Sequence, residues 1–188
     1  MSSALSNVIG VDDAPFSRTQ RGDVRLVGAV FARTRFDGVV IGSVRRDGSN
    51  ATSRIAEMIR RSTFAEHVQA VVLQGITVAG FNVIDIHELS GRLERPVLVV
   101  ARRAPDLPAI RRALLDFVPG GARKWKLIER AGPMEGVGRV FVQRAGLDRT
   151  AAARLLRDTT LYGALPEPLR VAHLIAGALS TGQSRGRA

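Results

Sequence analysis

The spacing of hydrophobic residues changes once along the chain, from a pattern typical of strands to one that alternates helices with strands. This change constrains the fold more than any other feature. Residues 7–12, 24–32 and 37–46 are three β-rich runs joined by short connections, which predicts an antiparallel meander. After Asn50, a good helix N-cap, amphipathic stretches with helical spacing alternate with short apolar runs. Such runs are typical of strands covered on both faces. The pattern predicts an α/β protein with one mixed sheet and helices on both faces.

The later elements follow from the same periodicity. The predicted helices cover 51–61, 82–93, a segment capped by Asp106, 148–159 and 169–179, and the predicted strands cover 70–73, 97–100 and 139–143. Residues 124–129 fit either a helix or a strand, and the glycines between 132 and 138 read as a loop. This order, a three-strand meander followed by βαβ crossovers, matches a ribonuclease H-like sheet. It argues against a doubly wound nucleotide fold, in which a helix follows the first strand.

Composition narrows the class of protein. The 188 residues include no cysteine, which excludes a disulfide framework, a thiol nucleophile and an iron–sulfur cluster. We expect one domain over 1–182 and a flexible basic tail over 183–188. No apolar run approaches the roughly 20 residues of a membrane span, and the N-terminus lacks a signal-peptide pattern. The expected location is therefore the cytoplasm, with no membrane partner.

The net charge is +11, which favours a polyanionic partner such as nucleic acid. Because 26 of the 28 basic residues are arginine, a codon bias is the alternative explanation for the excess. Arg102 and Arg103 follow a predicted strand and could contact phosphates. Lys124 and Trp125 combine charge with an aromatic ring, which suits backbone contact and base stacking, although a core or interface position is the favoured interpretation of Trp125.

Acidic residues stand where predicted strands and helices end or begin. Asp12 and Asp13 end the first strand, Asp47 precedes the first helix, Glu57 lies on that helix, and Gln74 ends the fourth strand. The carboxyl ends of parallel strands share one edge of a sheet, so these side chains could converge and hold divalent cations. Oxygen ligands of this kind suit Mg²⁺. The structural alternative is that the aspartates cap turns and Glu57 is a solvated helix residue.

The segment after Gln74 supplies candidate substrate contacts. Gly75, Gly80, Phe81 and Asn82 lie in a glycine-flanked loop whose backbone could approach a base turned out of a duplex. His173 has apolar neighbours on a predicted helix, so we interpret it as a buried, hydrogen-bonded histidine rather than a catalytic one.

Several blocks of the sequence carry a resemblance to a known family. They are 8–16 (VIGVDDAPF), 47–52 (DGSNAT), 73–85 (LQGITVAGFNVID) and 166–176 (PEPLRVAHLIA), and 102–106 and 182–185 also fit. In order and over nearly the whole chain, they resemble the endonuclease dU (deoxyuridine endonuclease) family, which is related in fold to endonuclease V. The resemblance implies a ribonuclease H-like fold and metal-dependent DNA cleavage at deaminated bases, deoxyuridine in particular.

The resemblance also implies roles for individual residues. Asp12 occupies the position of the first-strand catalytic aspartate of endonuclease V, and Asp47 and Glu57 are both candidates for the second carboxylate. With Mg²⁺ or Mn²⁺ as cofactor, the implied ligands are Asp12, Asp13, Asp47 and Gln74.

The sequence departs from the pattern at two positions. Gln74 stands where the endonuclease V motif has Asp-Gly, and Asn50 stands where Asp is expected in many relatives. Gln offers an oxygen but no negative charge, so metal affinity should fall, and Asp85 or Asp13 could compensate. The sequence therefore leaves three hypotheses: an endonuclease, a non-catalytic nucleic-acid-binding module on the same fold, and a scaffold or metabolite-binding domain.

Overall fold

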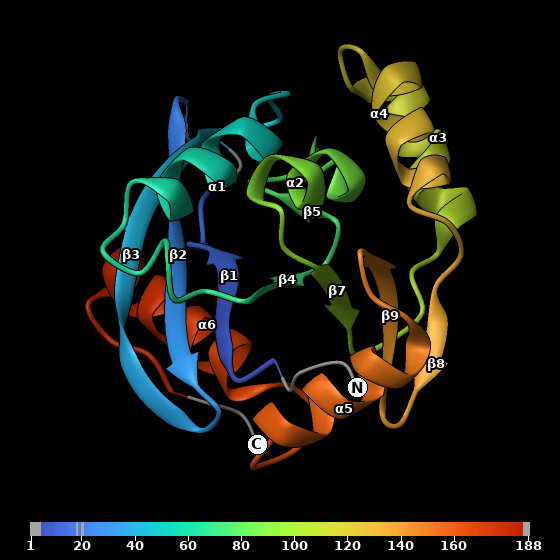
Figure 1. Ribbon diagram of the computed structural model, residues 1–188. Helices are drawn as coiled ribbons and strands as arrows, with labels where there is room; N and C mark the ends of the chain where they lie inside the picture. The colour runs from blue at the N-terminus through green and yellow to red at the C-terminus, as the bar shows by residue number, and fades with distance from the viewer. Residues whose placement is uncertain (1–4, 18, 20, 186–188) are drawn as a thin grey trace.

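A seven-stranded mixed sheet forms the centre of the computed structural model, which describes residues 5–17, 19 and 21–185 (Figure 1). The strands lie in the order β3-β2-β1-β4-β7-β9-β8. The three central strands β1, β4 and β7 are parallel, and every other pairing in the sheet is antiparallel. The first three strands form the predicted meander, and the sheet confirms the predicted fold class.

The strands of this sheet are β1 (Asn7–Asp13), β2 (Asp23–Ala32), β3 (Arg35–Arg45), β4 (Ala70–Gln74), β7 (Val97–Ala101), β8 (Glu135–Val137) and β9 (Val140–Ala145). A separate hairpin pairs β5 (Thr77–Val78) with β6 (Asn82–Val83). The helices are α1 (Ala51–Arg60), α2 (Ile86–Leu93), α3 (Leu107–Phe117), α4 (Gly121–Arg130), α5 (Arg149–Thr159) and α6 (Glu167–Thr181).

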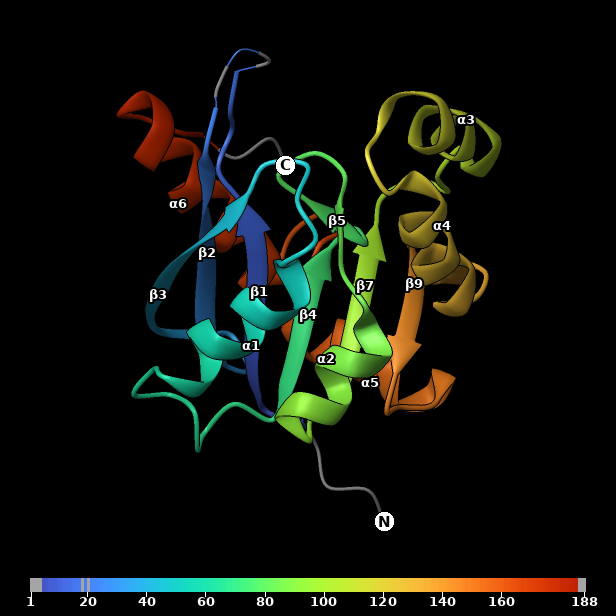
Figure 2. The same ribbon diagram turned by 90° about the horizontal axis from the view of Figure 1, so that it is seen from above.

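Helices cover both faces of the sheet, as predicted. Helices α1 and α2 pack on one face through apolar side chains that include Ile55 and Leu89, and α5 and α6 pack on the other through Leu155 and Leu169. Helices α3 and α4 pack against each other around Leu114 and stand beside the sheet (Figure 1). Figure 2 shows this α3–α4 pair near the end at which β1, β4 and β7 finish. We call residues 102–130 the arm.

The alternation of side chains along the central strands determines what each face presents at that end. Val11 of β1 pairs in register with Leu73 of β4, and both side chains belong to the core beneath α1 and α2. Because successive side chains of a strand point to opposite faces, the next residues, Asp12 and Gln74, face α5 and α6. Asp13 faces the α1 side again.

Helix α6 lies unusually close to β1. A Cβ atom added at Gly10 would stand 2.3 Å from the backbone carbon of Pro168, in the first turns of α6. Only a residue without a side chain permits this approach. The contact holds α6 against the strand that carries Asp12, so it affects the site described below.

The prediction of a helix over 82–93 is wrong at its start. Asn82 lies in the β5–β6 hairpin, and α2 begins only at Ile86. Asp85 is buried and caps α2 by accepting a hydrogen bond from the backbone of Glu88 at 3.0 Å. Asp85 also forms an ion pair with Arg130 of α4.

Two ambiguous segments are resolved by tertiary pairing. Residues 124–129 belong to helix α4, and the glycine-containing segment read as a loop contains the short edge strand β8. No helix within the described residues is both long and apolar enough to cross a membrane. The proposed basic tail lies partly outside the described residues, at 186–188.

Candidate active site

The carboxyl ends of β1 and β4 bring Asp12 and Gln74 next to each other on the α6 face of the sheet. Asp12 is 5% exposed, and its Oδ1 accepts a hydrogen bond from the backbone N–H of Asp13 at 3.0 Å. The Gln74 Oε1 atom is buried and has no hydrogen-bond partner among the described residues. A buried polar atom without a partner costs free energy and is complementary to a donor or a cation.

The second oxygen of Asp12 contacts α6. His173 Nδ1 lies 2.8 Å from Asp12 Oδ2, and the hydrogen bond raises the pKa of His173, although burial and the nearby charge of Arg102 oppose this rise. The prediction of a hydrogen-bonded His173 is confirmed. The prediction that it is buried is wrong, because its side chain is 57% exposed. The exposed ring lies over the buried carboxylate of Asp12.

Asp13 faces the other side and holds the β5–β6 hairpin. Its Oδ2 accepts a hydrogen bond from the backbone N–H of Ala79 at 2.9 Å. Burial, together with the adjacent negative charge of Asp12, raises the pKa of Asp13 to about 6, although the hydrogen bond from Ala79 acts in the opposite direction. Asp13 is thus a carboxylate whose negative charge is poorly compensated by its surroundings.

Asp47 binds the same hairpin from the loop between β3 and α1. Its backbone N–H donates to the carbonyl of Ala79 at 2.9 Å, and its Oδ1 accepts from the backbone N–H of Phe81 at 2.8 Å. Asp47 adopts a positive φ of 50°, and a Cβ atom at Gly80 would stand 2.3 Å from its carboxylate. Asp13 and Asp47, which lie far apart in the sequence, are therefore both attached to residues 79–81. We call Asp12, Asp13, Asp47 and Gln74 the acidic edge.

Glu57 has a different position from the other predicted acids. It lies on the exposed surface of α1, where it forms ion pairs with Arg54 at 3.0 Å and Arg61 at 3.2 Å. These partners neutralise Glu57 on the helix surface. Asp47 also pairs with an arginine, Arg46, at 3.2 Å, but unlike Glu57 it is attached to the same hairpin as Asp13, so Asp47 is the candidate second carboxylate.

Asn82 and Lys124 have structural partners. Asn82 is fully buried, its Oδ1 accepts from the backbone N–H of Ala51 at 3.0 Å, and its Nδ2 donates to the carbonyl of Arg45 and to Asn50. Asn82 thus satisfies the first turn of α1, and the Asn50 side chain makes no cap hydrogen bond of its own. Lys124 is buried, and its Nζ donates to the backbone carbonyl of Asp47 at 2.6 Å. Burial lowers the pKa of Lys124.

The remaining predicted contacts lie on or beside the arm. Arg102 and Arg103 are exposed at the end of β7, and the charge of Arg102 acts on His173. Trp125 donates a hydrogen bond from Nε1 to Glu129 at 2.6 Å, and Arg111 lies 6.0 Å from the centre of its ring. Trp125 is therefore held within the arm rather than displayed free for stacking.

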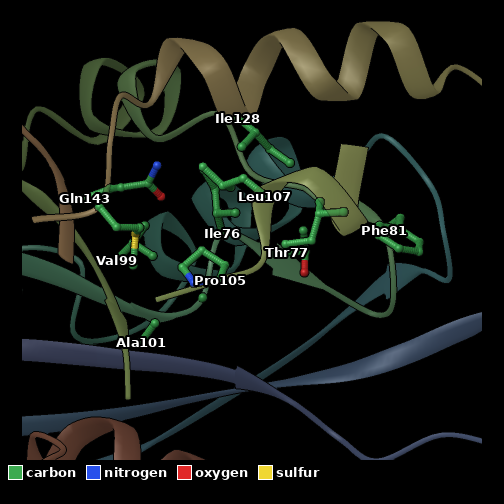
Figure 3. Close-up of a pocket in the computed structure, with 12 residues that line it drawn as sticks. Ile76, Thr77, Phe81, Val99, Ala101, Pro105, Leu107, Ile128 and Gln143 are labelled. Atoms are coloured by element: carbon green, nitrogen blue, oxygen red, sulfur yellow. The ribbon is translucent and has the colours of Figure 1, made fainter. Parts of the chain in front are cut away.

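A pocket of about 200 Å³ lies between the sheet and the arm (Figure 3). Its walls are mainly apolar and include Ile76, Phe81, Val99, Leu107, Ile110 and Ile128, and Thr77 and Gln143 contribute polar side chains. Gly75, which follows Gln74 directly, lines it as well, so this pocket begins beside the acidic edge.

The donor set of the acidic edge fits a sparsely coordinated divalent cation. The described part of the chain contains no group of three or more His, Cys, Asp or Glu side chains arranged to hold a metal ion. Mg²⁺, however, commonly takes one or two carboxylates and keeps several waters. Asp12 and the unpartnered Oε1 of Gln74 provide two oxygen donors on the α6 face, whereas Asp13 faces the α1 side and its Oδ2 accepts from the backbone of Ala79.

The ribonuclease H-like sheet, whose central strand β1 ends in Asp12 and Asp13, is a fold shared with nucleases. The chain belongs to the endonuclease dU family, whose sequence profile matches residues 5–180. The family predicted from the sequence blocks is confirmed. A UPF0215 protein of Deinococcus radiodurans is 56% identical over 183 residues, which cover 97% of this chain and 93% of that protein.

Solved structures agree with this assignment. A protein of unknown function from Archaeoglobus fulgidus matches with a TM-score of 0.86 and 32% identity, over 92% of this chain and 97% of that one. Endonuclease V of Ciona intestinalis, solved with DNA containing an inosine followed by a ribo-adenosine, matches with a TM-score of 0.57 and 15% identity, over 89% of this chain and 82% of that one. The second likeness is one of fold.

Proposed function

We propose that this protein is a divalent-metal-dependent endonuclease that cuts DNA at deaminated bases such as deoxyuridine. The observation that carries the proposal is the position of Asp12 and Gln74, each one residue beyond the last registered pair of β1 and β4 (Val11 with Leu73), together with the buried Oε1 of Gln74, which has no partner among the described residues. Membership of the endonuclease dU family and the fold shared with endonuclease V support the same reaction class.

The acidic edge supplies the ligands for the cation in this proposal. Asp12 and Gln74 would hold Mg²⁺ or Mn²⁺ from the α6 face of the sheet, and Asp13 and Asp47, which are both attached to residues 79–81, would supply further carboxylates from the other side. Bound divalent ions would activate a water and stabilise the leaving oxygen of a phosphodiester, as in two-metal hydrolysis. His173 fixes the orientation of the Asp12 carboxylate through the 2.8 Å hydrogen bond, so it is a positioning residue.

Substrate binding in this proposal uses both the arm and the pocket. Arg102 and Arg103 are exposed beside the acidic edge and would contact phosphates, which orient a nucleic acid without recognising its sequence. An engineered cavity of about 150 Å³ admits benzene, so a pocket of about 200 Å³ has room for a single-ring base turned out of the stack. Gly75 lines the pocket and allows the backbone to pass close to that base, whereas Gly80 faces the carboxylate of Asp47.

The test is cleavage of a labelled DNA duplex that contains one deoxyuridine. With Mg²⁺ or Mn²⁺ we expect a nick near that base, no nick in EDTA, and loss of about a thousandfold or more in rate for Asp12→Asn. Glu57→Gln is the matched control, because it neutralises an acid that is paired on the surface of α1. A folded protein that makes no nick with either ion would contradict the proposal.

Gln74 favours a second candidate, a non-catalytic nucleic-acid-binding module. An amide in place of a carboxylate weakens cation binding, and a net charge of +11 is sufficient for binding to DNA. This candidate predicts salt-sensitive DNA binding without cleavage, and Asp12→Asn would leave that binding unchanged.

A further inference from the structure

One polar side chain of the pocket has no part in the mechanism above. Gln143 of β9 is buried, and its Nε2 donates a hydrogen bond to the backbone carbonyl of Gly132 at 2.6 Å. Because a carbonyl oxygen can only accept, this hydrogen bond fixes the nitrogen toward Gly132 and leaves the amide oxygen as the available end. The orientation of the Gln143 amide is therefore set before any ligand enters.

The Oε1 atom of Gln143 makes no hydrogen bond within the described residues, and the side chain lines the pocket. Figure 3 shows the amide end of Gln143 directed toward Ile76 and Leu107, both of which are apolar. An acceptor held between apolar walls is complementary to one well-placed N–H donor, and it disfavours a second acceptor.

We propose that Gln143 recognises the base in this pocket by accepting a hydrogen bond from its ring N–H group. This inference rests on the proposed function and specifies the chemistry of its substrate. Deamination of cytosine places a hydrogen on N3, where cytosine itself has an unprotonated acceptor, and deamination of adenine does the same at N1. A single fixed acceptor therefore distinguishes a deaminated base from its parent, since the parent presents a lone pair to Oε1.

The location of the pocket agrees with this assignment. Gly75 lines the pocket and directly follows Gln74, so a nucleotide whose phosphate lies at the acidic edge can extend its base toward Gln143. The apolar walls exclude water from the hydrogen bond, which increases the penalty for presenting the wrong base.

The test measures binding, not cleavage. Labelled single-stranded oligonucleotides carrying one deoxyuridine, one deoxycytidine or one N3-methyldeoxyuridine are titrated with the protein in EDTA by fluorescence anisotropy. Single strands remove the difference in base-pairing cost between the probes. We expect deoxyuridine to bind about tenfold or more tightly than the other two probes.

Gln143→Met should remove this preference, so that deoxyuridine and deoxycytidine bind alike. Gln69→Met is the control, because the Gln69 amide holds Ser6 and Asn7 at the opposite edge of the sheet, and this variant should keep the preference. The N3-methyl probe tests the wild-type protein and so does not depend on how the variant folds.

Two results would overturn the proposal: equal binding of deoxyuridine and its N3-methyl derivative by the wild type, or an unchanged preference in a folded Gln143→Met protein. A protein that prefers deoxyuridine but never cuts would contradict the endonuclease and leave this role of Gln143 intact. Deoxyuridine-specific cleavage that is unchanged in Gln143→Met would support the endonuclease and contradict this role of Gln143.

Discussion

At the scale of single residues, the contact between His173 and Asp12 joins α6 to the acidic edge. It spans 161 positions of the chain and links an exposed ring to a buried carboxylate. A hydrogen bond of this kind restricts the rotation of Asp12 and keeps its negative charge directed toward the edge. In the proposed mechanism, His173 therefore acts by positioning the side chain of Asp12.

Replacing His173 by Ala should slow cleavage of deoxyuridine DNA by about tenfold or more, because Asp12 loses its orienting partner. Binding of the same DNA in EDTA should change by less than about twofold, since the ring is not proposed to contact substrate. Single-turnover rates and anisotropy titrations separate the two quantities. His67→Ala is the control, as His67 is exposed in the segment between α1 and β4. Equal rates for the two variants would exclude the positioning role.

Asp13 should make the metal-free protein less stable as the pH rises. Its pKa is about 6 in the folded state, against 3.8 for an aspartate in the unfolded chain, so between these values the folded protein binds more protons than the unfolded chain. The free energy of unfolding should therefore fall by about 2 kcal/mol from pH 4 to pH 6, out of about 3 kcal/mol over the whole titration. Urea titrations in EDTA should show this decline in the wild type and a flatter profile in Asp13→Asn. Parallel profiles would mean that Asp13 is not the group responsible.

At the scale of helices and strands, the close approach of α6 to β1 at Gly10 couples the fold to the site. Gly10→Ala would place a methyl group against the backbone of Pro168, and a helix backbone cannot yield as a flexible side chain can. We expect a loss of about 1–3 kcal/mol in unfolding free energy and slower cleavage, because α6 carries His173 away from Asp12.

The matched substitution for Gly10→Ala is Gly91→Ala in helix α2, where an added Cβ atom meets no heavy atom within 4 Å. There Ala should stabilise the protein by roughly 0.5–1 kcal/mol and leave the cleavage rate unchanged. Urea unfolding and rate measurements on both variants provide the comparison. If Gly10→Ala is as stable and active as Gly91→Ala, the proposed coupling is wrong.

The long periodic elements could be predicted from the sequence, and the short ones could not. The meander, α1, α5 and the buried strands follow from runs of apolar residues at fixed spacing. The two-residue strands β5 and β6 are too short to show a period. Val83 also stands three residues before Ile86, so the helical pattern extended backward into the hairpin. The secondary structure of residues 77–83 is therefore set by the pairing of β5 with β6 and not by local periodicity.

The site was predictable to the same degree. Asp12 and Gln74 follow from the rule that parallel strands end at one edge, which local sequence can indicate. The attachment of Asp13 and Asp47 to residues 79–81 depends on backbone groups that carry no sequence signal. The exposure of His173 depends on where α6 lies against Gly10, which the sequence does not show. The apolar neighbours of His173 in the sequence therefore led to the wrong prediction that it is buried.

At the scale of the whole molecule, the net positive charge is concentrated in the arm. The arm contains eight basic residues and three acidic ones, which gives 8 − 3 = +5 of the total +11. Within the described residues, no carboxylate forms an ion pair with Arg102, Arg103, Arg111 or Arg112. A codon bias would distribute arginine without regard to the site, whereas DNA binding requires it here.

The position of the charge can be tested at constant net charge. Arg102→Ala with Arg103→Ala and Arg154→Ala with Arg157→Ala each remove two positive charges, the first pair beside the acidic edge and the second on α5, away from the arm (Figure 1). A plot of log affinity for duplex DNA against log salt should lose about 0.9 in slope for each phosphate contact removed. We therefore expect a slope shallower by up to about 1.8 for the first double variant and an unchanged slope for the second. Because both proteins carry the same net charge, equal slopes would show that the arginine excess acts only as bulk charge, and the phosphate contacts assigned to Arg102 and Arg103 would be wrong.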